Sequence, residues 1–181
     1  MKNALIIILV IIILAGAGWY FWSNRPGEPR TPVSKVNSFE ECLKQGGPVM
    51  ESYPRQCRSQ DGKTFVEDIG NALAKQDSVR LTKPRPNDIV RSPLIIEGEA
   101  RGNWYFEGSF PVTLLDGRGK IIARGPAQAQ EEWMTTDFVP FKIGLKFDLP
   151  ETETGFLVLE KDNPSGLPEN ADELRIPVKF R

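Results

Sequence analysis

Residues 79–181 carry the pattern that most restricts the fold, a series of short apolar segments separated by turn-forming residues. In residues 141–147 every second side chain is apolar, and Lys142 and Lys146 fall on the opposite face of the expected strand. About seven such strands in about a hundred residues predict a mainly β, immunoglobulin-like sandwich, although an open barrel would give similar periodicity. The expected strands are 79–82, 94–100, 109–116, 120–124, 139–149, 156–161 and 174–180.

Residues 4–22 form an uncharged, mostly apolar run of nineteen residues that ends in the aromatic residues 19–22. As a helix rising about 1.5 Å per residue, this run would extend roughly 28 Å, which is enough to cross a hydrocarbon core. We therefore expect a single-pass transmembrane anchor over 1–23, followed by a polar linker over 24–36. The alternative is a signal peptide that is cleaved at the small residues 15–17.

The chain has two cysteines, Cys42 and Cys57, with fourteen residues between them. A disulfide that closes this loop would stabilise the fold by about 3 kcal/mol, and such bonds persist outside the cytosol. We therefore expect a disulfide, and with it a chain whose bulk is extracytoplasmic. A pair of free thiols is the alternative, whereas a metal site lacks an obvious third or fourth ligand.

Residues 37–70 are expected to fold around this disulfide as a small α+β module. Ser38 and Glu41 are spaced as in a capping box, which predicts the start of a short helix that Gly46 can end. Residues 63–67 are typical of a short strand. The expected organisation is thus an anchor, a linker, a Cys-looped module and a β-rich domain over 79–181.

The composition argues against several classes of function. With 23 basic and 24 acidic residues the net charge is −1, which disfavours nucleic-acid binding. The absence of histidine excludes Ser-His-Asp and Cys-His nucleophile systems and His-ligated zinc. The acidic residues of 79–181 show no spacing typical of a glycosidase pair, and Ser165 lacks the Gly-x-Ser-x-Gly context. We expect no enzymatic activity, no metal and no cofactor.

Four blocks of the β-rich domain follow one another at 88–107, 110–116, 133–138 and 162–168. In sequence and in order they resemble the Gmad-type immunoglobulin-like domain of bacterial spore-germination proteins. The resemblance covers about 79–181 and implies an immunoglobulin-like sandwich in an extracytoplasmic, envelope-associated protein, and it does not imply an enzyme. Because an anchor and a Cys-looped module precede this domain in place of a GerM-like domain, a general surface or wall role is as consistent as a role in germination.

Three consecutive aromatic residues, Trp104, Tyr105 and Phe106, are the first candidates for a ligand-binding surface. Successive side chains of a strand point to opposite faces, so the three cannot all point inward on a strand. Either Tyr105 faces away from its neighbours, or the run lies on a bend after Gly102. Exposed, these rings would stack on a sugar or an apolar partner; packing in the sandwich core is the alternative.

Trp133 follows two acidic residues and is the second candidate. An exposed tryptophan there would contact carbohydrate or peptide, and packing between the sheets is the alternative. The loop at 162–166 is rich in turn formers and is expected to be structural rather than a calcium site. The expected ligand-binding residues are Arg101, Trp104, Tyr105, Glu107, Trp133 and Asp137.

Together these features predict a single-pass, membrane-anchored, non-catalytic binding module of the bacterial cell envelope, with cell-wall glycan or an envelope protein as its ligand. The alternative is a structural or assembly role in which strand edges pair with another chain. An exposed aromatic cluster would favour the first function. Buried Trp104 and Trp133 beside a bare, flat edge strand would favour the second.

Overall fold

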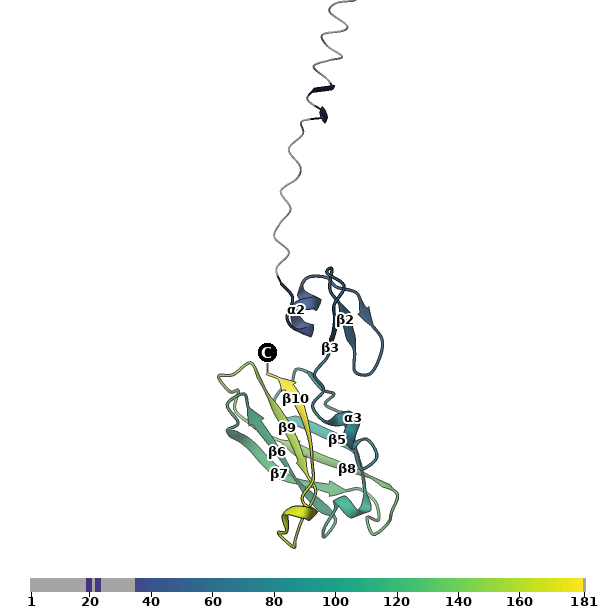
Figure 1. Ribbon diagram of the computed structural model, residues 1–181. Helices are drawn as coiled ribbons and strands as arrows, with labels where there is room; N and C mark the ends of the chain where they lie inside the picture. Colours follow the sequence, from purple (N-terminus) through teal and green to yellow (C-terminus); the bar gives the residue numbers. More distant parts are fainter. Residues whose placement is uncertain (1–18, 21, 24–34, 181) are drawn as a thin grey trace, which may run out of the picture. The chain divides into compact units, whose positions relative to one another are not determined.

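The computed structural model describes residues 19–20, 22–23 and 35–180 (Figure 1), and the chain falls into two compact units, 1–37 and 38–181. The expected anchor over 1–23 and linker over 24–36 therefore lie largely outside the described residues. Within the described part of the chain, no helix is long and apolar enough to cross a membrane. The Cys-looped module and the β-rich domain belong to the same unit.

The module consists of one short helix and a small antiparallel sheet in the strand order β1-β2-β3. Its elements are α2 (Phe39–Lys44), β1 (Val49–Met50), β2 (Gln56–Arg58) and β3 (Thr64–Val66). The side chain of Ser38 accepts a hydrogen bond from the backbone N–H of Glu41 at 3.2 Å, so the predicted cap is present. The helix ends at the predicted glycine, since Gly46 is left-handed with φ 73° and the N–H of Gly47 returns to the carbonyl of Cys42.

The predicted disulfide between Cys42 and Cys57 is confirmed, and both residues are fully buried. It joins α2 to the central strand β2 of the module. Gly47 packs directly against this bond, because a Cβ atom at Gly47 would lie 2.7 Å from the sulfur of Cys42 and 2.8 Å from that of Cys57. The module is thus built on the disulfide and the glycine beside it.

The β-rich domain contains seven antiparallel strands in the order β10-β9-β6-β7-β8-β5-β4 (Figure 1). The short helix α3 (Ala72–Lys75) precedes them. Single turns of 3-10 helix, η1 (Gly102–Trp104) and η2 (Pro168–Asn170), lie in two of the connections. The strands are β4 (Val79–Lys83), β5 (Leu94–Arg101), β6 (Ser109–Asp116), β7 (Ile121–Ala129), β8 (Phe138–Leu145), β9 (Thr154–Glu160) and β10 (Glu173–Lys179).

These strands form two layers, because β7 and β8 share only two residue pairs where one layer passes into the other. One layer is β10-β9-β6-β7 and the other is β8-β5-β4. Phe110 of the first layer and Phe141 of the second meet edge-to-face with ring centroids 4.9 Å apart in the core. The prediction of a mainly β domain with seven strands is confirmed.

The predicted strand boundaries differ from the observed ones by more than two residues at two places. β7 extends to Ala129 rather than to 124, because Gly125, Pro126 and Ala127 pair with β6 despite their lack of an alternating apolar pattern. β8 ends at Leu145 rather than at 149, because the next buried ring, Phe147, bonds through its backbone N–H to the Ser92 hydroxyl.

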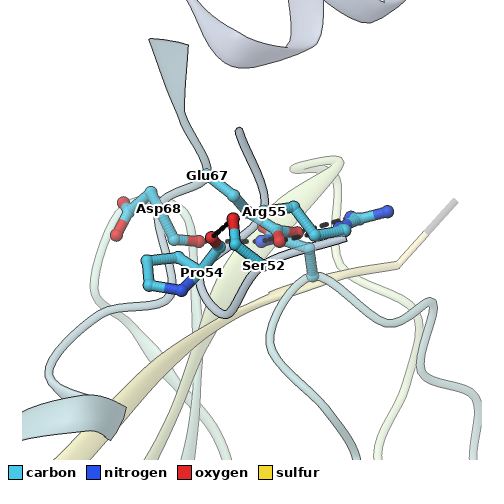
Figure 2. A network of polar contacts seen from close by, with 6 residues as sticks. Ser52, Pro54, Arg55, Glu67 and Asp68 are labelled. Carbon is cyan, nitrogen blue, oxygen red and sulfur yellow. Dashed lines mark hydrogen bonds and ion pairs between the residues drawn. The ribbon is translucent and has the colours of Figure 1, made fainter. Parts of the chain in front are cut away.

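A buried carboxylate fastens the module to the sandwich (Figure 2). Glu67 accepts hydrogen bonds from Nε and Nη2 of Arg55 at 2.8 and 2.5 Å, and one from Nδ2 of Asn87 at 3.1 Å. Asn87 also donates from Nδ2 to the carbonyl of Asp68 at 2.8 Å, and its backbone N–H bonds to the carbonyl of Pro177 in β10 at 2.7 Å. The hydrogen bond and charge of Arg55 lower the pKa of Glu67 below its ordinary value.

The outer edge of β10 is covered along its length by the segments that lead into β4 and β5. Arg175 and Asn71 are joined by two hydrogen bonds. The backbone N–H of Arg175 donates to Oδ1 of Asn71 at 2.7 Å, and the backbone N–H of Asn71 donates to the carbonyl of Arg175 at 3.1 Å. Farther along the strand, the N–H of Val90 bonds to the carbonyl of Lys179 at 2.7 Å. Gly70 allows this close approach, since a Cβ there would lie 2.0 Å from the Arg175 oxygen.

Candidate functional site

Three loops meet at one end of the sandwich, which we call the loop end: 102–108, 130–137 and 161–172. They lie together because the strands that they connect end at the same end of the sandwich. Ser109 pairs with Gln128, and Glu160 pairs with Glu173. The module attaches at the opposite end of β10, where Pro177 receives the bond from Asn87. The loop end therefore lies at the far end of the sandwich from the module.

Close backbone contacts hold the three loops against one another. Gly102 lies so close to the second loop that a Cβ atom would come within 1.8 Å of the Thr135 oxygen and 2.4 Å of the Trp133 oxygen. The third loop joins the first through a bond from the N–H of Asp162 to the carbonyl of Trp104 at 3.0 Å. These contacts make the loop end one surface rather than three separate loops.

Trp104 and Tyr105 are buried in the core, with exposed fractions of 1% and 4%. The Tyr105 hydroxyl donates to the carbonyl of Val139 at 2.7 Å, and its ring contacts Phe110 edge-to-face at 5.2 Å. Burial raises the pKa of Tyr105 above its ordinary value. The predicted stacking platform is therefore corrected, because the turn η1 after Gly102 directs both rings inward.

Arg101 is held by other parts of the fold. Its guanidinium lies over the ring of Phe138 at 4.1 Å, and it donates to the carbonyls of Thr136 at 3.0 Å and Asp77 at 3.2 Å. Arg80 lies over the same ring at 4.0 Å. Arg101 thus fixes the second loop to the segment before β4, and its role in orienting a ligand stays a prediction.

The other three predicted residues do lie together on the loop end. Glu107 and Asp137 are exposed, and Glu107 follows the aromatic run in a left-handed conformation with φ 51°. Trp133 is half-buried, and its ring reaches Gly108, where a Cβ would lie 3.4 Å from Cδ1 and 3.5 Å from Nε1. This contact places the ring of the second loop beside the end of the first loop.

Phe106 and Met134, with exposed fractions of 43% and 74%, were absent from the expected ligand-binding residues, although Phe106 belongs to the aromatic run that the sequence indicated. Phe106 is the member of the aromatic run that turns outward, and Met134 adjoins Trp133. Trp133 contacts Gly108, two residues after Phe106, and Met134 follows Trp133 in the sequence. We call these three residues of the loop end the apolar patch: Phe106, Trp133 and Met134. The adjacency of large apolar residues to acidic ones was the sequence feature that pointed to it.

Within residues 19–20, 22–23 and 35–180, no group of three or more histidine, cysteine, aspartate or glutamate side chains is placed to hold a metal ion. The described loop end presents apolar side chains and carboxylates to a ligand.

Comparison with known proteins agrees with this architecture. Residues 78–166 match the family model Gmad2, the immunoglobulin-like domain of bacterial spore germination. The match spans β4 to β9 and the loop end up to Gly166, and β10 completes the same sandwich. No curated protein and no solved structure matches the chain. Over residues 78–166 the sandwich is therefore similar to the immunoglobulin-like domain of bacterial spore germination.

Proposed function

We propose that this chain is a non-catalytic binding protein of the bacterial cell envelope that holds its ligand at the loop end of the sandwich. The family of the sandwich supports a bacterial envelope setting. The disulfide between Cys42 and Cys57 supports a location outside the cytosol, where such bonds persist. A membrane anchor within residues 1–23 remains part of the proposal, and it rests on the uncharged run at 4–22.

The observation that carries the proposal is the exposure of Phe106 and Met134 at the end of the sandwich that faces away from the module. Large apolar side chains that gather on a rigid surface mark interaction sites, because their contact with water costs free energy that a partner removes. The described chain enters the sandwich through the module, so a chain tethered by its N-terminal segment would keep the loop end free for a ligand.

The strand edges favour binding by loops over the alternative of strand pairing. The edge of β10 is already bonded to Asn71, Asn87 and Val90. β7 carries Pro126, and a proline removes a donor from an edge. The register of β4 against β5 shifts after Leu81, which interrupts that edge. Such devices oppose the addition of a strand from another chain.

The ligand that we propose is an envelope protein rather than wall glycan. Recognition of sugar rings relies on exposed, flat aromatic faces, and the two rings best placed for it in the sequence, Trp104 and Tyr105, are core residues. Met134 is flexible and polarizable, which suits an irregular protein surface. Trp133 and Phe106 are aromatic rings that are not fully buried, so the experiment also tests binding to glycan.

The experiment compares retention of the purified full chain by isolated cell-wall sacculi and by immobilised envelope proteins. A patch variant, Phe106→Ser with Met134→Ser, tests the apolar patch. Its matched control, Ile121→Ser with Leu149→Ser, changes two comparably exposed side chains at the other end of the sandwich.

We expect the envelope proteins to retain the wild type and the control but not the patch variant, with all three equally folded by circular dichroism. Retention by sacculi alone would replace the protein ligand with glycan. Equal retention of the patch variant and the wild type would refute binding at the loop end.

A further inference from the structure

The charge of the loop end differs sharply from that of the rest of the sandwich. The three loops carry seven acidic residues and one lysine, a net charge of −6, whereas the whole chain has a net charge of −1. At the opposite end, the connections 84–93, 117–120 and 146–153 carry four acidic and five basic residues. The acidic residues of the loop end are Glu107, Glu131, Glu132, Asp137, Asp162, Glu169 and Asp172.

The acidic residues on the two loops that carry the apolar patch form no salt bridge within the described chain. Asp172 pairs with Lys75 at 2.5 Å, but no salt bridge joins Glu107, Glu131, Glu132 or Asp137 to any other residue of the described chain. Glu132 accepts a hydrogen bond from the backbone N–H of Met134 at 3.0 Å, which holds its carboxylate beside the patch. All four side chains are exposed.

The patch and its acidic surroundings together define the partner. We propose that the loop end binds a protein segment in which lysine or arginine residues flank an apolar side chain. The apolar side chain would cover Phe106, Trp133 and Met134, and the basic residues would lie against the surrounding carboxylates. An apolar centre within a charged rim supplies affinity through the centre, and specificity and association rate through the rim. This inference rests on the proposed function and adds the chemistry of the partner.

The same charge argues against anionic wall polymers as ligands. A phosphate- or carboxylate-bearing polymer would bring like charges toward Glu107, Glu131, Glu132 and Asp137, and like charges brought together at an interface disfavour binding. The single lysine of the three loops, Lys161, lines another hollow of the surface together with Glu160 and Asp172. The nearby Arg101 is engaged by the Phe138 ring and by backbone carbonyls. A basic segment gains attraction from the carboxylates that would repel a polyanion.

The test is a selection of random 12-residue peptides, displayed on phage, against the immobilised full chain. A charge variant carries Glu107→Gln, Glu131→Gln, Glu132→Gln and Asp137→Asn. Its control removes acidic charge from the opposite end through Asp148→Asn, Glu151→Gln and Glu153→Gln. The patch variant is included, and the dissociation constant of the most enriched peptide is measured for every chain.

We expect the wild type and the control to enrich peptides in which lysine or arginine adjoins an apolar residue, and the patch variant to enrich none of them. The charge variant should bind the best peptide at least about tenfold more weakly at about 0.1 M salt. Because about 1 M salt shortens the screening length to about 3 Å, the two chains should then differ by about twofold or less.

Three results would overturn the inference: no enrichment, enrichment without basic residues, or equal binding by the charge variant. If retention of envelope proteins still depends on Phe106 and Met134 in those cases, the proposed function stands and only the basic partner fails. If that dependence is also absent, both fail.

Discussion

The joint between module and sandwich allows a prediction that runs against intuition: removing the more exposed member of the Arg55–Glu67 pair should cost more than removing the buried one. The side chain of Arg55 is 51% exposed and that of Glu67 is 6% exposed. Replacement of Arg55 by alanine leaves a buried carboxylate whose one remaining side-chain donor is Asn87. Replacement of Glu67 by alanine leaves a guanidinium that water can reach.

The magnitudes follow from this difference. An uncompensated buried charge typically costs about 3–5 kcal/mol, which is the decrease that we expect in the free energy of unfolding of Arg55→Ala. For Glu67→Ala we expect about 1.5–3 kcal/mol, the range for lost hydrogen bonds to charged groups whose partner is solvated.

The pH dependence gives an independent signature. In the wild type, the pKa of Glu67 is lowered by Arg55, so its contribution to stability is present above the ordinary glutamate pKa and is lost as pH falls through the lowered value. In Arg55→Ala, burial without a cation raises that pKa. The folded state then binds more protons than the unfolded state, and stability increases as pH falls from about 7 to about 5.

The assay is urea denaturation of the purified chain, followed by circular dichroism, at pH 7 and pH 5. Val66→Ala, an exposed substitution in the neighbouring strand β3, serves as the control and should stay within about 0.5 kcal/mol of the wild type. The reasoning is refuted if Glu67→Ala costs as much as Arg55→Ala, or if Arg55→Ala is no more stable at pH 5 than at pH 7.

Three further predictions concern the core and the disulfide. Gly102→Ala should decrease the free energy of unfolding in urea by about 3 kcal/mol or more. Gly144→Ala should have a small effect, because its Cβ would lie 3.5 Å from the nearest atom. Equal effects of the two substitutions would contradict the close packing of the loops. Tyr105→Phe should cost about 1–2 kcal/mol, because the carbonyl of Val139 loses its donor, and a neutral result would contradict that bond. Replacement of Cys42 by serine should destabilise the module by about 3 kcal/mol. The measurement is hydrogen exchange of the module's amides, and unchanged protection would contradict a structural role for the disulfide.

The sequence predicted the strands best where alternation and turn chemistry agreed. β6 begins and ends where it was expected, at Ser109 and Asp116, because its buried and partly buried residues alternate over most of its length and a tight turn follows. β7 was predicted too short, since main-chain pairing with β6, and not side-chain pattern, holds Gly125 and Pro126 in the ladder. Register against a neighbour is a tertiary property that a single segment does not encode.

The candidate site was predicted in its location but not in its residues. The aromatic run and Trp133 do mark the loop end, yet the turn η1 sends Trp104 and Tyr105 inward and leaves Phe106 outside. A bend after Gly102 was one of the two expected arrangements, and it is the one observed, because Gly102 packs closely against the second loop. Since that contact joins residues more than thirty positions apart, local sequence does not reveal it.

The joint had no sequence signature at all. Arg55, Glu67 and Asn87 lie twelve and twenty residues apart along the chain, in no recognisable motif, and they meet only because β10 brings Asn87 to the module. Such networks depend on how separate segments dock, and they become visible only in three dimensions.

The most direct test of binding at the loop end is site-specific photo-crosslinking in the cells that produce the chain. A photoreactive amino acid replaces Phe106 or Met134 in the loop end, or Ile121 or Leu149 at the opposite end as controls. We predict a crosslinked product of discrete mass from positions 106 and 134, sensitive to the charge variant, and none from positions 121 and 149. Crosslinks that form equally at both ends, or only at 121 and 149, would contradict the proposal that the loop end holds the ligand.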